Sequence, residues 1–81
     1  MMNNLLDKRN YYCELYNLYS SLLNETTRNR FTQFYFDDLS LSEIAEKENV
    51  SKNAVFLSIK KGEKELLSYE NKLKLFSKNK K

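Results

Sequence analysis

A group of residues between positions 40 and 60 has the side-chain types and spacing of a nucleic-acid contact surface. A lysine can neutralise a phosphate or contact guanine, and an asparagine amide can pair with both N6 and N7 of adenine. Serine hydroxyls and backbone N–H groups at the start of a helix can bond phosphate. The candidate residues are Ser40, Ser42, Ser51, Lys52, Asn53, Phe56, Leu57 and Lys60. They predict a nucleic-acid site, with DNA favoured over RNA.

Phe56 and Leu57 leave two uses of this surface open. Outward apolar side chains can contact thymine methyl groups in DNA, or they can contact a protein partner. Glu48, next to the expected turn, would repel phosphate if it were exposed. Arg28 and Arg30 would add phosphate contacts if they shared the surface.

The stretch 38–61 predicts the helix-turn-helix that would present these residues. Ser40 and Glu43 have the spacing of a capping box, which begins a helix at about 41 and carries it to about 47. Its expected inner face is Leu41, Ile44 and Ala45. Asn49 suits the left-handed turn position, because asparagine tolerates positive φ.

The second helix of the motif is expected to start after Ser51, a good N-cap. Val50 is expected to fill the corner between the two helices. The residues expected to face back onto the first helix are Ala54, Val55 and Ile59.

The apolar register of this second helix continues past Gly62. It runs through Val55, Ile59, Gly62, Leu66, Tyr69, Leu73 and Phe76 in alternating steps of four and three. This phase predicts one long helix over about 52–77, with Gly62 as the place for any kink. The C-terminal residues Leu66, Tyr69, Leu73 and Phe76 then need a partner. They either pack on the first helix of the same chain or form a homodimer interface; a membrane surface or another protein is a lesser alternative.

Two further helices are expected before the motif. The first runs over about 4–23 and carries a tyrosine- and leucine-rich face. The second follows Asn24 as N-cap and extends to about 36, burying Phe31, Phe34 and Tyr35. Asp37 and Asp38 should end it. We therefore predict an all-α helical bundle, a single helix-turn-helix domain over 1–77, and a basic disordered tail at 78–81.

Composition narrows the function. The chain has 81 residues, no histidine and one cysteine, Cys13, which excludes a Cys/His zinc site and a histidine-based triad. Cys13 is expected in or beside the core. We predict no cofactor, no metal and no enzyme activity. The sequence shows no signal-peptide pattern and no apolar run of membrane-spanning length, so a cytoplasmic protein is expected.

Charge is unevenly distributed along the chain. Residues 1–50 hold five basic and eight acidic residues, whereas residues 51–81 hold nine basic and three acidic. A basic half can supply the non-specific phosphate term of nucleic-acid binding, although a solvated lysine-rich helix would show the same composition.

The run FYFDDLSLSEIAEKENVSKNAVFLSIKKGEKELLSYENKLKLF, with LYNLYSSLLNETTRNRF before it, resembles the YlxM-type family of small bacterial helix-turn-helix proteins. That family is similar to region four of bacterial sigma factors and is associated with the signal recognition particle genes. The most specific matches are DDLSL at 37–41, EIA at 43–45 and YExKL at 69–73. This chain departs from the family pattern at Lys52, Asn53, Phe56 and Leu57, where arginine, glutamine, tyrosine and a polar residue are usual.

The resemblance implies an all-helical homodimer that regulates or assists the signal recognition particle pathway. Two functions therefore stay open. One is a DNA-binding regulator; the other is an accessory that binds protein or RNA of the particle without reading a DNA sequence.

Overall fold

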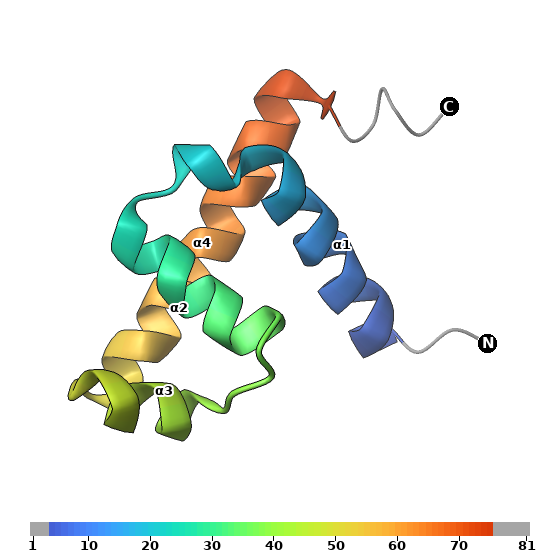
Figure 1. Ribbon diagram of the computed structural model, residues 1–81. Helices are drawn as coiled ribbons and strands as arrows, with labels where there is room; N and C mark the ends of the chain where they lie inside the picture. The colour runs from blue at the N-terminus through green and yellow to red at the C-terminus, as the bar shows by residue number, and fades with distance from the viewer. Residues whose placement is uncertain (1–3, 76–81) are drawn as a thin grey trace.

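The computed structural model describes residues 4–75, with side chains from Lys8 onward. These residues form helices and connecting turns, and no strand occurs among them. The order is α1 (Asn4–Tyr19), a 3-10 turn η1 (Ser20–Leu22), α2 (Glu25–Tyr35), α3 (Leu41–Glu48) and α4 (Lys52–Leu73). The predicted all-α fold is confirmed. Figure 1 shows α3 against the start of α4, α2 across its middle, and the end of α1 beside its C-terminal half.

The first helix is shorter than predicted. Its α-helical part ends at Tyr19, and the turn η1 replaces the last residues of the expected span. The Leu23 N–H bonds to the Ser20 carbonyl at 3.0 Å, and Leu23 itself is extended. This tightened last turn lets the chain reverse into α2 within a few residues, which a continued α-helix would not allow.

Asn24 caps α2 as predicted. Its side chain accepts a hydrogen bond from the Thr27 N–H at 2.8 Å. The helix ends at Tyr35, one residue before the expected end, and Asp38 takes a left-handed conformation with φ of 63°. Aspartate is among the residues that adopt this conformation most readily, so the Asp37–Asp38 pair breaks the helix as its composition indicated.

Both caps of α3 follow the sequence. Ser40 and Glu43 form the predicted capping box, with bonds of 3.1 Å and 2.8 Å. Asn49 has φ of 58°, and the Val50 N–H reaches back to the Ala45 carbonyl at 3.0 Å. This is the Schellman pattern that ends a helix at a left-handed residue. Val50 was predicted to fill the corner, but its side chain is exposed and its backbone N–H makes the turn contact instead.

Helix α4 runs without interruption through Gly62, which confirms the single long helix over most of its predicted length. It ends at Leu73, where Lys74 adopts a left-handed conformation. Gly62 is buried, and a Cβ added there would lie 3.1 Å from Thr27 Cγ2 and 3.3 Å from Phe31 Cδ2. The glycine is therefore the point where α2 crosses close to α4, rather than a hinge.

Two clusters of buried side chains make up the core. The larger joins α1, α2 and the C-terminal half of α4, and it contains Tyr12, Leu15, Tyr19, Leu23, Phe31 and Leu66. The smaller lies between α3 and the start of α4, and it contains Ile44, Ala45, Val55 and Ile59. Tyr35 packs against both clusters, so the helix-turn-helix rests on the rest of the bundle through this ring.

The C-terminal apolar stripe of α4 divides between the core and the surface. Leu66 is fully buried within its own chain and Tyr69 packs against the same cluster. For Leu66 the prediction of a dimer contact needs correction, because the tyrosine-rich face of α1 already covers it. Leu73 is 46% exposed. Phe76 and the predicted tail at 78–81 lie outside the described residues.

Candidate nucleic-acid interface

The smaller core cluster fixes the angle between α3 and α4. Ile44 and Val55 are fully buried against each other's helices, and Ala45 and Ile59 complete the contact. Ser51 caps α4 by accepting a hydrogen bond from the Ala54 N–H at 3.0 Å. The two helices and their turn therefore form a rigid unit that can present one face of α4 to a ligand.

Arg30 of α2 forms hydrogen bonds to both helices of this unit. Its Nε lies 2.7 Å from Glu48 Oε1 at the end of α3, and its guanidinium donates to Ser58 Oγ of α4 at 2.8 Å. The Arg30 side chain is largely buried. The condition for a phosphate contact by Arg30 is therefore not met, because the side chain is largely buried and its Nε and one terminal nitrogen already donate inside the protein.

Glu48 belongs to the same hydrogen-bond network as Arg30. Besides Arg30 it accepts a hydrogen bond from Gln33 Nε2 at 2.6 Å. Partial burial alone would raise the pKa of Glu48, but the hydrogen bonds from Arg30 and Gln33 and the nearby positive charge outweigh it and lower that pKa. The carboxylate is ionised but paired, so the expected repulsion of phosphate is largely cancelled.

Arg28 is also occupied. Its guanidinium donates to the backbone carbonyls of Ser20 and Leu23, at 3.4 Å and 2.9 Å. These bonds hold the turn between α1 and α2, which packs near the C-terminal half of α4. Arg28 thus supports the other end of the bundle from the one where α3 meets α4.

All the residues predicted to contact nucleic acid are exposed. They are Ser40, Ser42, Ser51, Lys52, Asn53, Phe56, Leu57 and Lys60. The last five lie on the first turns of α4, and Ser40 and Ser42 lie at the start of α3. The structure therefore leaves each of them accessible to solvent; whether they bind nucleic acid stays a prediction.

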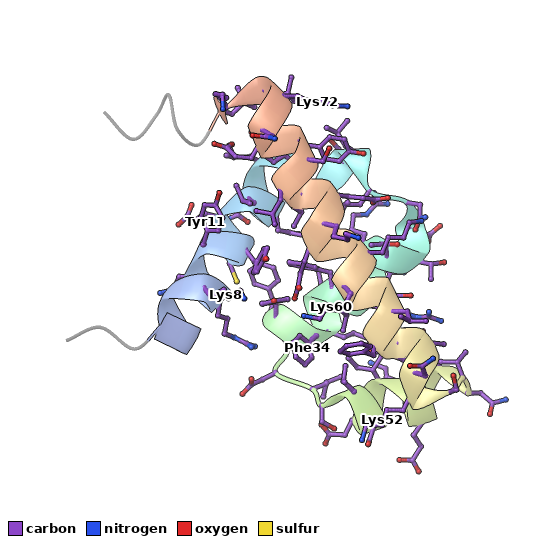
Figure 2. The ribbon with its side chains drawn as sticks, turned by 180° about the vertical axis from the view of Figure 1, so that it is seen from behind. Lys8, Tyr11, Phe34, Lys52, Lys60 and Lys72 are labelled. Atoms are coloured by element: carbon purple, nitrogen blue, oxygen red, sulfur yellow. The ribbon has the colours of Figure 1, made fainter. Side chains whose placement is uncertain are left out.

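One stripe of α4 gathers the central members of this set. Asn53, Leu57 and Lys60 follow each other at helical spacing, with Phe56 at the edge of the stripe. They point away from the buried Val55 and Ile59. Figure 2 views the molecule from the side on which α4 lies in front, with Lys52 near the start of the helix and Lys60 farther along it.

The next turn adds a cation that the sequence analysis did not assign to the site. Lys64 is exposed and lies four residues after Lys60, on the same stripe. Helical spacing alone would have identified it. We define the stripe face as Asn53, Phe56, Leu57, Lys60 and Lys64.

Lys60 is positioned by its neighbours. Its Nζ lies 5.7 Å from the centre of the Phe56 ring and 3.4 Å from Glu63 Oε1. Glu63 in turn accepts a hydrogen bond from the Tyr35 hydroxyl. Burial, followed by this bond and the charge of Glu63, raises the pKa of Tyr35, so that its hydroxyl stays a donor. The surface cation is thus linked to the ring that joins the two core clusters.

The serine caps keep a donor for a ligand. Ser40 Oγ and Ser51 Oγ each use a lone pair to accept a backbone N–H. A hydroxyl that accepts can still donate its own hydrogen, so both remain able to bond a phosphate oxygen. Ser42 is exposed in the first turn of α3.

Metal-ligand and thiol chemistry can be assessed for residues 4–75. No group of three or more histidine, cysteine, aspartate or glutamate residues within them could hold a metal ion. Burial is the main reason that the pKa of the Cys13 thiol is raised, which lowers the thiolate fraction at neutral pH. Within the same part of the chain, no helix combines the length and the hydropathy needed to cross a bilayer.

Comparison with known proteins identifies the family. Residues 6–81 match the family model UPF0122, described as "Putative helix-turn-helix protein, YlxM / p13 like". A UPF0122 protein of Lactococcus lactis subsp. cremoris (strain MG1363) is 46% identical over 72 residues, which are 89% of this chain and 65% of the relative. One from Clostridium botulinum (strain Alaska E43 / Type E3) is 51% identical over 65 residues, 80% of this chain and 60% of the relative.

A third relative, the UPF0122 protein ABC2295 of Shouchella clausii (strain KSM-K16), is 45% identical over 74 residues. That alignment covers 91% of this chain and 68% of the relative. The chain thus spans about two thirds of the length of these relatives. Together with the capped α3–turn–α4 unit, these matches show that the chain belongs to the UPF0122 family of YlxM/p13-like helix-turn-helix proteins.

Proposed function

We propose that this protein binds duplex DNA by placing the first turns of α4 in the major groove. The observation that carries the proposal is the stripe face, whose residues are all exposed on a helix that packs its opposite side into the core. The major groove is wide enough to admit one α-helix, and a base-reading helix of this kind needs its outward residues free.

Charge supports an anionic ligand at this end of the molecule. Lys52, Lys60, Lys61 and Lys64 are all exposed along the part of α4 from Lys52 to Lys64. Glu48, the acidic residue at the turn, is paired with Arg30. Lysines on either side of a groove-bound helix neutralise phosphates and release counterions, which supplies most of the sequence-independent affinity.

The test is fluorescence anisotropy with a labelled 20-base-pair duplex at 50 mM salt, where phosphate contacts are strong. We expect nanomolar to micromolar affinity and a large loss in the double variant Lys52→Ala/Lys60→Ala. Lys72→Ala is the matched control, because Lys72 is an exposed lysine of α4 five turns from the start of the helix. Equal binding by wild type and the double variant would contradict the proposal.

A second candidate is a protein- or RNA-binding accessory of the signal recognition particle, and the observation that supports a protein partner is the exposure of Phe56 and Leu57. Two adjacent apolar side chains on the outer face of a helix also suit a protein partner. In this case Phe56→Asp should abolish capture of the particle's protein or RNA, with the helical circular dichroism spectrum unchanged. Capture of no particle component by the wild type would count against this candidate.

We further propose that two copies associate through the C-terminal part of α4 and the residues just after it. Leu67, Leu73 and Leu75 are each between 39% and 46% exposed, whereas Leu66 is buried in its own chain. Leu73→Glu should therefore reduce the mass measured by light scattering from dimer to monomer without unfolding the chain. A monomeric wild type would disprove the association.

A further inference from the structure

We infer that Leu57 and Phe56 contact the C5-methyl groups of thymine, so that the stripe face prefers A·T base pairs in duplex DNA. This inference rests on the proposed DNA binding and names the chemistry that the bound helix reads. It makes use of the two apolar side chains that a purely phosphate-binding surface would not need.

The exposure of the two side chains is the first observation. Leu57 is 56% exposed and Phe56 is 41% exposed, although both belong to a helix with a well-packed inner side. Leu57 lies at the centre of the stripe face, directly opposite the buried side of α4, and Phe56 lies at its edge. In a helix lying in the major groove, the central position approaches the base edges most closely.

The residues on either side of this apolar pair are the second observation. Asn53 precedes it by one turn, and Lys60 and Lys64 follow it on the same stripe. A ligand that matches this stripe carries anionic groups beside a small apolar group. Thymine is the base that presents a methyl group in the major groove between phosphate backbones, and its partner adenine presents the N6 and N7 atoms that an asparagine amide can pair with.

The dimensions agree with this arrangement. Asn53 and Lys60 are seven residues apart, which corresponds to roughly 10 Å along an α-helix. A stretch of this length can pass the edges of several successive base pairs, which are spaced by about 3.4 Å along the DNA axis. Lys60 Nζ lies 5.7 Å from the centre of the Phe56 ring. A cation therefore lies beside the apolar side chain that would contact the methyl group.

The experiment changes only the methyl group. Anisotropy is measured with four 20-base-pair duplexes: an A·T duplex with thymine, the same duplex with deoxyuridine, a G·C duplex with cytosine, and that duplex with 5-methylcytosine. Losing a buried methyl group corresponds to about a fourfold loss of affinity. We expect the thymine duplex to bind at least fourfold more tightly than the deoxyuridine duplex, and 5-methylcytosine to tighten G·C binding.

Two leucine variants assign the effect to a residue. Because Phe56 also contacts methyl groups, Leu57→Ala should reduce the preference for thymine over deoxyuridine, and Leu57→Ala/Phe56→Ala should abolish it. Leu22→Ala is the matched control, because Leu22 is a 50% exposed leucine of η1, outside both the stripe face and the proposed association surface, and it should preserve the difference. Both positions are on the surface, so both variants should fold.

The possible results separate methyl reading, its assignment to Leu57, and DNA binding itself. Salt-sensitive binding that is equal for the thymine and deoxyuridine duplexes overturns methyl reading and leaves DNA binding standing. A thymine preference that is unchanged in Leu57→Ala overturns the assignment to Leu57. Absence of binding to all four duplexes overturns both this inference and the proposed function, and it leaves a protein partner as the occupant of the apolar pair.

Discussion

Arg30 Nε lies 2.7 Å from Glu48 Oε1 and joins the middle of α2 to the end of α3. The same guanidinium donates to Ser58 of α4, so one side chain contacts both helices of the motif. The smaller core cluster sets the crossing of α3 and α4, and this polar network fixes the turn between them. Arg30 and Glu48, which the sequence analysis treated as possible surface charges, therefore help to hold the proposed DNA-reading helix α4 in place.

Removing the negative charge of Glu48 should destabilise the fold. Glu48→Gln keeps the shape of the side chain but loses the ion pair with Arg30, and we expect a loss of about 1–3 kcal/mol in the free energy of unfolding by urea titration. The matched control is Asp38→Asn, which breaks the ion pair with Arg9 at a carboxylate that is 93% exposed. Its effect should stay below about 0.5 kcal/mol. Equal effects of the two variants would refute the bracing role.

The Glu48 carboxylate should make the free energy of unfolding depend on pH. The pKa of Glu48 is lower in the folded state than in the unfolded chain, so its ionised form stabilises the fold. This contribution is complete above the unfolded pKa, about 4.3, and is lost as pH falls through the lower folded pKa. The difference in unfolding free energy between wild type and Glu48→Gln should therefore shrink between pH 7 and pH 3. A difference that stays constant over this range would show that Glu48 is not responsible.

The hydroxyl of Tyr19 should matter more than that of Tyr69. Tyr19 is buried, donates to Glu70 Oε1 at 2.6 Å and accepts the Leu75 N–H at 3.0 Å. Tyr19→Phe should cost about 1–3 kcal/mol in thermal or chemical unfolding, because hydrogen bonds to charged groups are among the stronger ones. Tyr69→Phe, which removes a 3.3 Å bond to the Leu22 carbonyl at the surface, is the control and should cost less than about 1 kcal/mol. The reverse order would argue against the buried contact.

The close approach of Thr27 and Phe31 should limit which side chains position 62 can hold. In an open helix, Gly→Ala stabilises by about 1 kcal/mol, but here the new methyl meets Thr27 Cγ2 at 3.1 Å. We expect Gly62→Ala to be more favourable by about 1 kcal/mol in a Thr27→Ser background, which lacks that methyl, than in the wild type. Additive effects of the two substitutions would mean that the helices do not press on each other here.

Much of the fold could be predicted because its signals are local. The bonds of the Ser40–Glu43 capping box and of the Asn24 and Ser51 caps lie within one turn of helix, so residue type and spacing specify them. The unbroken phase of apolar residues across Gly62 likewise predicted the long α4. The early end of α1 was missed, because the 3-10 turn depends on how closely α2 must follow.

The candidate site could be predicted only in part. The exposure of Asn53 and Leu57 follows from helical periodicity once Val55 and Ile59 are placed inside. Lys52 is exposed because it is the first residue of α4. The roles of Arg30 and Glu48 did not follow, since their bond joins residues 18 positions apart on different helices. For the same reason the sequence could not decide whether Leu66 packs within its own chain or against a second copy. The packing of α1 against α4 buries it within the chain.

The most direct test of the account is the salt dependence of duplex DNA binding by wild type and Lys52→Ala/Lys60→Ala. Each phosphate contact contributes about −0.9 to the slope of log K against log salt concentration. We predict a steep negative slope for the wild type and a slope shallower by about two units for the double variant, whose two lysines are both exposed on α4. Identical slopes, or no wild-type binding at 50 mM salt, where phosphate contacts are strongest, would contradict the account.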